Sequence, residues 1–191
     1  MADQESSQAG TSNPIEERLK EILPDESQRE HFLRLVGQLE SDAPALVILK
    51  GHLVIEERLT AVIEKFVFHP EHLDKARLTF AQKVTIARSL SLDEDKNSMW
   101  NLIEKLNVLR NKLSHSLDGE PRAKAIETVK TAYAAECSGK VNEHEGDDTV
   151  ILAGAIALCL GFVHAMEQEV GRFRDYVGTM DRIVNPHRYK K

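Results

Sequence analysis

The apolar run from Val150 to Val163 constrains the fold more than any other feature of the chain. A membrane-spanning helix needs roughly 18 to 20 apolar residues, whereas this run is shorter and is followed at once by His164 and Glu167. A helix that is apolar on every side is otherwise the central, buried helix of a bundle. We therefore expect a long helix from Thr149 to about Val177 at the centre of the protein, and no contact with a membrane.

Helix start signals recur before this run. In a capping box, Ser, Thr or Asp precedes Gln or Glu by three residues, and such pairs begin at Asp25, Thr79 and Ser91, each ahead of apolar residues at helical spacing. Aromatic residues make up only 5% of the chain, and no pair of alternating strands joined by a hairpin turn is visible. The sequence thus predicts an all-α protein, an antiparallel bundle of about six or seven helices with mostly short connections.

Proline and glycine mark the expected ends of several helices. A long helix is expected to begin at Pro44 and to end at Pro70, because the residue before a proline is disfavoured in a helix. Gly119 is expected to close the helix that precedes it, since glycine is common just past a helix end. Pro121 is expected in the first turn of the next helix, which runs to about Cys137.

The bundle is expected to form one domain over residues 14–178. Residues 1–13 are small and polar, and such a composition buries too little apolar surface to offset the entropy lost on ordering, so we expect a disordered tail there. Residues 179–191 are expected to form a basic C-terminal tail. This tail either helps to recruit RNA or only solvates the end of the chain.

Charge and cysteine content narrow the functional classes. The net charge of −6 argues against a surface that is basic throughout and binds nucleic acid non-specifically, although a small basic site is compatible with it. Two cysteines provide neither a disulfide framework nor a four-ligand zinc site, which favours a reducing compartment. The first residues show no secretory signal. We expect a cytoplasmic protein.

No cofactor or metal site is expected. The chain has no Walker-type loop, no dinucleotide-binding glycine fingerprint and no nucleophile elbow. His69, Glu71, His72 and Asp74 carry side chains that bind metals, but Pro70 interrupts the helix that would align them. We interpret this segment as a turn between helices.

The most informative segment is the helix end that carries Arg110, Asn111 and His115. Four leucines before and within it fall within about 60° of one another on a helix and form its buried stripe; they are Leu102, Leu106, Leu109 and Leu113. Asn111 and His115 lie on nearly the opposite side, and Arg110 lies on the flank between. The pattern offers a guanidinium, an amide and an imidazole to a neighbouring surface.

Such a triplet is suited to cleaving RNA without a metal ion. An imidazole with a pKa near 6.5, the usual value, can take the proton of the 2′-hydroxyl or protonate the leaving oxygen, and a guanidinium binds phosphate oxygens. The spacing alone is not specific, because Arg182 and His187 share it. Simple capping is the alternative, in which the histidine interacts with the helix dipole and the other two side chains hold loops or a second copy.

In this context the sequence resembles the HEPN superfamily, all-helical domains marked by an Arg, a polar residue after it and a His four to six positions beyond the Arg. The motif stands in LNVLRNKLSH, residues 106–115, and the stretches Gly51–Leu59 and Ala76–Lys83 also look similar. The resemblance covers roughly residues 43–170. It implies a bundle that forms a homodimer in which two copies of the motif face one groove.

The resemblance also implies an activity. Many family members are metal-independent endoribonucleases of toxin–antitoxin, phage-defence or RNA-processing systems, so RNA and an antitoxin or regulatory protein are the implied partners. Arg110 would bind the scissile phosphate, Asn111 would orient it, and His115 would be the general acid or base. Other members, including those that resemble the mannitol operon regulator, are non-catalytic. A regulatory or protein-interaction module is therefore the alternative expectation, and the acidic charge departs from a clean toxin pattern.

Overall fold

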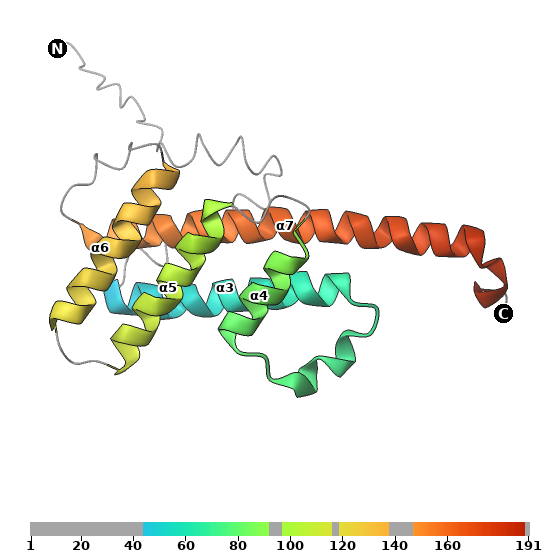
Figure 1. Ribbon diagram of the computed structural model, residues 1–191, viewed down its shortest axis with the longest axis horizontal. Helices are drawn as coiled ribbons and strands as arrows, with labels where there is room; N and C mark the ends of the chain where they lie inside the picture. Colours follow the sequence, from blue (N-terminus) through green and yellow to red (C-terminus); the bar gives the residue numbers. More distant parts are fainter. Residues whose placement is uncertain (1–43, 92–96, 116–118, 138–146, 190–191) are drawn as a thin grey trace, which may run out of the picture.

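The computed structural model describes residues 44–91, 97–115, 119–137 and 147–189. Within these ranges the chain forms five α-helices and three short 3-10 helices and no strand (Figure 1). The expected all-α class is therefore confirmed. The helix expected to begin at Asp25 and the tail expected over residues 1–13 lie outside the described residues.

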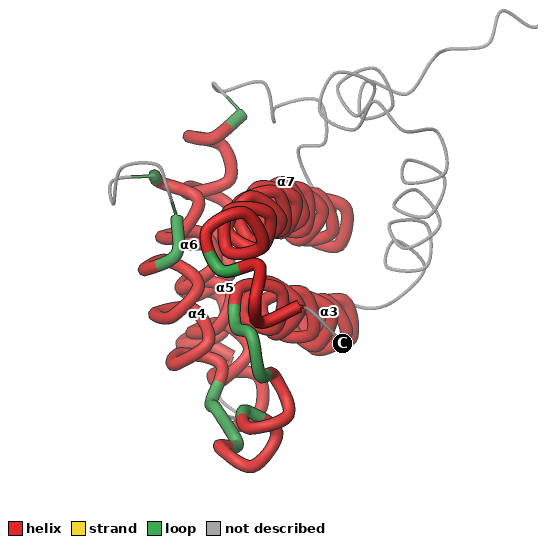
Figure 2. Tube along the Cα trace, turned by 90° about the vertical axis from the view of Figure 1, so that its right-hand side faces the viewer, coloured by secondary structure: helices red, strands yellow, loops and turns green. Residues whose placement is uncertain are grey.

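One layer of the fold is a pair of parallel helices, α3 (Pro44–Phe66) and α7 (Asp148–Val184). Gly51 faces Ile156 toward one end of the pair, and the ring of Phe66 stacks on that of Phe173 toward the other. Figure 2 shows the two helices side by side and nearly end-on. The expected antiparallel packing does not hold for this pair, because three helices intervene in the sequence and return the chain to its starting end (Figure 1).

The second layer consists of α4 (Phe80–Ser89), α5 (Ser98–His115) and α6 (Gly119–Glu136), which lie across the α3–α7 pair (Figure 2). Trp100 of α5 is 1% exposed and meets Phe162 of α7 edge-on, with ring centroids 5.0 Å apart. Where α6 approaches α7, Gly154 leaves room for Tyr133, whose hydroxyl oxygen would lie 2.5 Å from a Cβ at that position. The core thus lies between the two layers.

Helix α7 is the expected central helix, but it is longer than predicted. It ends at Val184 rather than near Val177, and its buried positions lie between Ile151 and Val170. Among the described helices, α7 is the one long and apolar enough to cross a membrane, yet 67% of its most apolar segment is buried in the bundle. The helix also continues past residue 179, where the basic tail was expected to begin, and the 3-10 helix η4 (Pro186–Tyr189) follows it.

Three further helix boundaries differ from those expected. Helix α3 ends at Phe66, and Pro70 instead begins the 3-10 helix η1 (Pro70–His72). Gly119 begins α6 rather than closing α5, since Pro121 occupies the first turn, where its missing N–H costs nothing. Helix α5 begins at Ser98 and not near Ser91.

Two helix starts show how side chains fix these boundaries. The backbone N–H of Met99 donates to the side-chain oxygen of Asn97 at 3.0 Å, which satisfies a donor that the first turn of α5 leaves free. The capping box predicted at Thr79 is confirmed. The side chains of Thr79 and Gln82 each accept a hydrogen bond from the other residue's backbone N–H at the start of α4.

Candidate functional site

Helix α5 buries the leucine stripe that its sequence predicts. Leu102, Leu106 and Leu109 are buried in the core, and Leu113 is packed against its edge. With this side fixed against its neighbours, Asn111 lies on the exposed side of the helix and Arg110 is half-buried on the flank. The helical spacing therefore places both residues as expected.

Arg110 and Asn111 are brought together by a hydrogen bond. The Nη1 of Arg110 donates to the Oδ1 of Asn111 at 3.1 Å, so the amide holds one edge of the guanidinium. A guanidinium has five N–H donors in a planar fork, and the remaining ones are suited to phosphate oxygens. His115 is the last residue of α5, and the position of its side chain lies outside the described part of the structure.

A second guanidinium, which the sequence analysis missed, lies at the same end of α5. The Nη2 of Arg122, in the first turns of α6, donates to the backbone oxygen of Leu113 at 3.0 Å. The positive charge interacts favourably with the negative end of the α5 dipole and satisfies a carbonyl that has no partner within the helix. The helix start that the sequence predicts at Pro121 could have indicated this contact. It places Arg122 in the first turn of the helix that follows α5, close to the end of α5.

His52 of α3 makes a buried contact with α5 near Arg110. Its Nε2 donates to the Oδ1 of Asn107 at 3.0 Å, and its ring stacks on that of Phe80 with centroids 4.0 Å apart. The other ring nitrogen, Nδ1, is buried and has no hydrogen-bond partner among the described residues. Because 55 positions separate His52 from Asn107, no local sequence signal could have paired them.

The environment of His52 favours the neutral imidazole. Burial lowers the pKa of His52 below the usual 6.5, and the charge of Arg110 lowers it further, against the opposing effects of the Asn107 hydrogen bond and Glu56. Glu56 in turn pairs with Lys83 of α4 at 2.8 Å. His52 therefore joins α3, α4 and α5 from a buried position, while an imidazole that acts on a substrate must be reachable from solvent.

Three further histidines of the described ranges lie in two separate groups. His164 lies beside the buried Glu167, which pairs with Lys65 at 2.8 Å and with Arg58 at 3.6 Å. Burial lowers the pKa of His164, and the charge of Glu167 opposes that shift.

The second group is exposed and lies at η1. The carboxylate of Glu71 lies 3.2 Å from the Nδ1 of His69 and 3.9 Å from the Nε2 of His72. Across the described ranges, no group of three or more His, Cys, Asp or Glu side chains is arranged to hold a metal ion. The end of α5 therefore remains the candidate functional site.

No family model matches this chain, and neither a curated protein nor a solved structure is significantly similar to it.

Proposed function

We propose that the protein is an HEPN-like RNA-binding domain and metal-independent endoribonuclease of the cytoplasm, with Arg110, Asn111 and His115 at its site. The observation that supports this proposal is the guanidinium of Arg110, held by the Asn111 amide on the outer flank of α5. The proposal keeps the expected bundle of six or seven helices, of which five lie in the described ranges.

Each residue has a distinct task in this reaction. Arg110 binds the scissile phosphate and stabilises the charge that develops on its oxygens. Asn111 keeps the guanidinium in position. His115 transfers a proton to or from the reacting oxygens, a contribution that is typically worth about 100-fold to 10,000-fold in rate. Arg122 offsets the negative end of the α5 dipole, which would otherwise repel the phosphate chain.

Two copies of the chain are proposed to share the groove, each presenting the end of its α5. A mixture of two inactive variants tests this arrangement. If one copy supplies Arg110 and the other His115, mixing Arg110→Ala with His115→Ala chains restores part of the activity, because some mixed dimers contain one intact site. If each copy contains a whole site, mixed dimers have no intact site and the mixture stays inactive.

The main test is RNA cleavage in the presence of EDTA. The purified full-length protein is expected to cut single-stranded RNA of mixed sequence and to leave a 2′,3′-cyclic phosphate, as in-line attack by the 2′-hydroxyl requires. His115→Ala is expected to lower the rate at least about 100-fold, and Arg110→Lys to weaken RNA binding because lysine lacks the bidentate fork. Lys124→Ala, at an exposed position of α6, is the control and is expected to keep full activity.

The alternative function has a clear signature in the same assay. Wild-type protein that neither binds nor cuts diverse RNAs would reject the proposal. If His115→Ala then changed only the oligomeric state, the end of α5 would belong to a non-catalytic regulatory module.

A further inference from the structure

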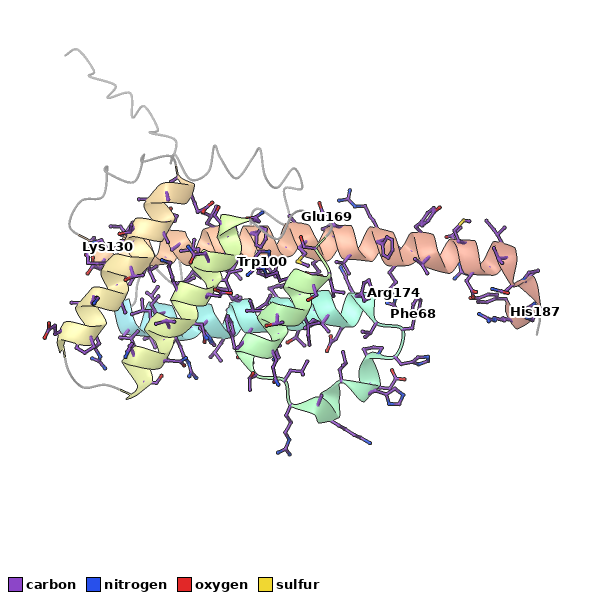
Figure 3. All side chains as sticks on the ribbon, viewed as in Figure 1. Phe68, Trp100, Lys130, Glu169, Arg174 and His187 are labelled. Atoms are coloured by element: carbon purple, nitrogen blue, oxygen red, sulfur yellow. The ribbon has the colours of Figure 1, made fainter. Side chains whose placement is uncertain are left out.

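The C-terminal part of α7 projects beyond the rest of the bundle. Helix α3 ends at Phe66, whose ring stacks on Phe173 with centroids 6.3 Å apart. Just beyond α3, the guanidinium of Arg174 lies 5.6 Å from the centre of the Phe68 ring (Figure 3). From there to Val184, Figure 1 shows no described helix beside α7 other than η4 at its tip.

This projecting segment carries a stripe of exposed apolar side chains. The stripe consists of Phe173, Tyr176, Met180, Ile183 and Val184, and Ile183 is 67% exposed. At about 100° per residue, the five positions fall within about 100° of one another around the helix. The charged residues of the segment lie on the other side: Arg174, Asp175, Asp181 and Arg182. We call the five apolar residues the α7 stripe.

The α7 stripe is not covered by the end of the described chain. Residues of η4 fold back onto the polar side of the helix instead. The carboxylate of Asp181 accepts hydrogen bonds from Arg188 at 3.0 Å and from Tyr189 at 2.5 Å. The guanidinium of Arg182 lies over the Tyr189 ring. Contiguous exposed apolar surface of this kind marks an interaction site in a soluble protein.

We propose that the α7 stripe binds the α7 stripe of a second copy of this chain. Its first four residues are spaced three, four and three apart, which is the spacing of the seam between two helices of a coiled coil. A second α7 presents an apolar seam of the same length and width, flanked by charges of both signs.

The exposed area and the helix composition support a second copy as the occupant. Five large side chains expose on the order of 500 Å² in each copy, so that two stripes together bury about 1,000 Å², the size at which specific interfaces begin. The segment also contains Gly178 and several β-branched residues, which are poor helix formers. A projecting helix of such composition is marginal in water without a packing partner.

The pairing is independent of the proposed RNA site. The projecting part of α7 and the C-terminal end of α5 lie at opposite ends of the molecule (Figure 1). Substitutions in the α7 stripe therefore leave Arg110 and Asn111 in place, and either proposal can fail without the other.

The test compares two glutamate substitutions on opposite faces of one helix. Ile183→Glu places a charge in the α7 stripe and is expected to lower the mass measured by sedimentation velocity, to that of the dimer that shares the α5 groove where that dimer forms and otherwise to that of the monomer. Gly178→Glu is the matched control, because its side chain would enter open space on the polar face, where no atom lies within 4 Å of the added Cβ. It is expected to keep the wild-type mass. Because Ile183 is exposed, the charged variant is expected to fold, which circular dichroism checks.

Three results would overturn the proposal. The first is that wild type and Ile183→Glu have the same mass, or that Gly178→Glu lowers the mass as much as Ile183→Glu does. The second is a monomeric wild type that binds vesicles of phosphatidylcholine and phosphatidylserine through the stripe, which would assign it to a membrane surface. The third is a monomeric wild type that Ile183→Glu destabilises, which would assign the stripe to residues 1–43 of the same chain.

Discussion

At the scale of single residues, the surroundings of each imidazole decide what it can do. His52 has its Nε2 bonded to Asn107 and its ring stacked on Phe80, so it holds α3, α4 and α5 together from a buried position. His115, at the last position of α5, belongs to a helix end where Arg122 supplies positive charge. The buried imidazole thus suits a structural task, whereas proton transfer is the task proposed for His115.

The lowered pKa of His52 predicts a stability that depends on pH. Burial is the main cause of the shift, so the folded protein binds this proton less readily than the unfolded chain. Stability from this group is therefore complete above the unfolded pKa of about 6.5 and decreases as the pH falls toward the folded pKa. Denaturant unfolding is expected to give a lower free energy of unfolding at pH 5.5 than at pH 7.5. The His52→Gln variant is expected to show a smaller difference between the two pH values.

His164 contributes in the same direction, because burial lowers its pKa too. The His52→Gln, His164→Gln double variant is therefore expected to show less pH dependence than either single variant. A loss of stability between the two pH values that is the same in wild type and in His52→Gln would contradict the assignment.

At the scale of helices, close packing of α3 on α7 depends on a residue without a side chain. A Cβ at Gly51 would clash with the Cδ1 of Ile156 and lie 2.8 Å from its Cγ1, in a fully packed interface. At Gly178, on the projecting part of the same α7, an added Cβ meets nothing within 4 Å. Alanine at the two positions is therefore expected to change the free energy of unfolding in opposite directions.

Gly51→Ala is expected to destabilise the protein by about 1 to 2 kcal/mol, because overpacking outweighs the gain of about 1 kcal/mol in helix propensity. Gly178→Ala is expected to be neutral or to stabilise by up to about 1 kcal/mol. Chemical denaturation measures both. Ile156→Val is further expected to cost less in the Gly51→Ala background than in wild type, since it removes one of the clashing carbons. If the effects of Ile156→Val and Gly51→Ala on the free energy of unfolding were additive, that result would contradict a clash between the two side chains.

At the scale of the whole molecule, the structure combines a two-layer core with a helix that leaves it. Burial of α7 ends at Val170, fourteen residues before the helix ends at Val184. Segments without buried contacts open at little cost in free energy, whereas core segments exchange only on global unfolding. The two parts of α7 therefore differ in local stability although they form one continuous helix.

Hydrogen exchange is expected to show this difference. In the Ile183→Glu variant, amides between Phe173 and Val184 are expected to exchange much faster than those between Ile151 and Val170. In wild type, pairing of the α7 stripe is expected to slow the exchange of the amides between Phe173 and Val184. Dilution of the protein is expected to reverse that protection. Equal protection of both groups in the variant would show that the projecting part is stabilised from within the chain.

The sequence by itself determined the helical class, the buried run of α7, the capping box at Thr79 and the exposed position of Asn111 beside Arg110. These features follow from local rules, since helical periodicity and capping involve residues only a few positions apart. Only the tertiary structure decided the parallel pairing of α3 with α7, the contact of His52 with Asn107 and the place of Arg122 at the end of α5. Those contacts join residues far apart in the chain or on different helices, and their partners are chosen by packing of the whole core rather than by any local pattern.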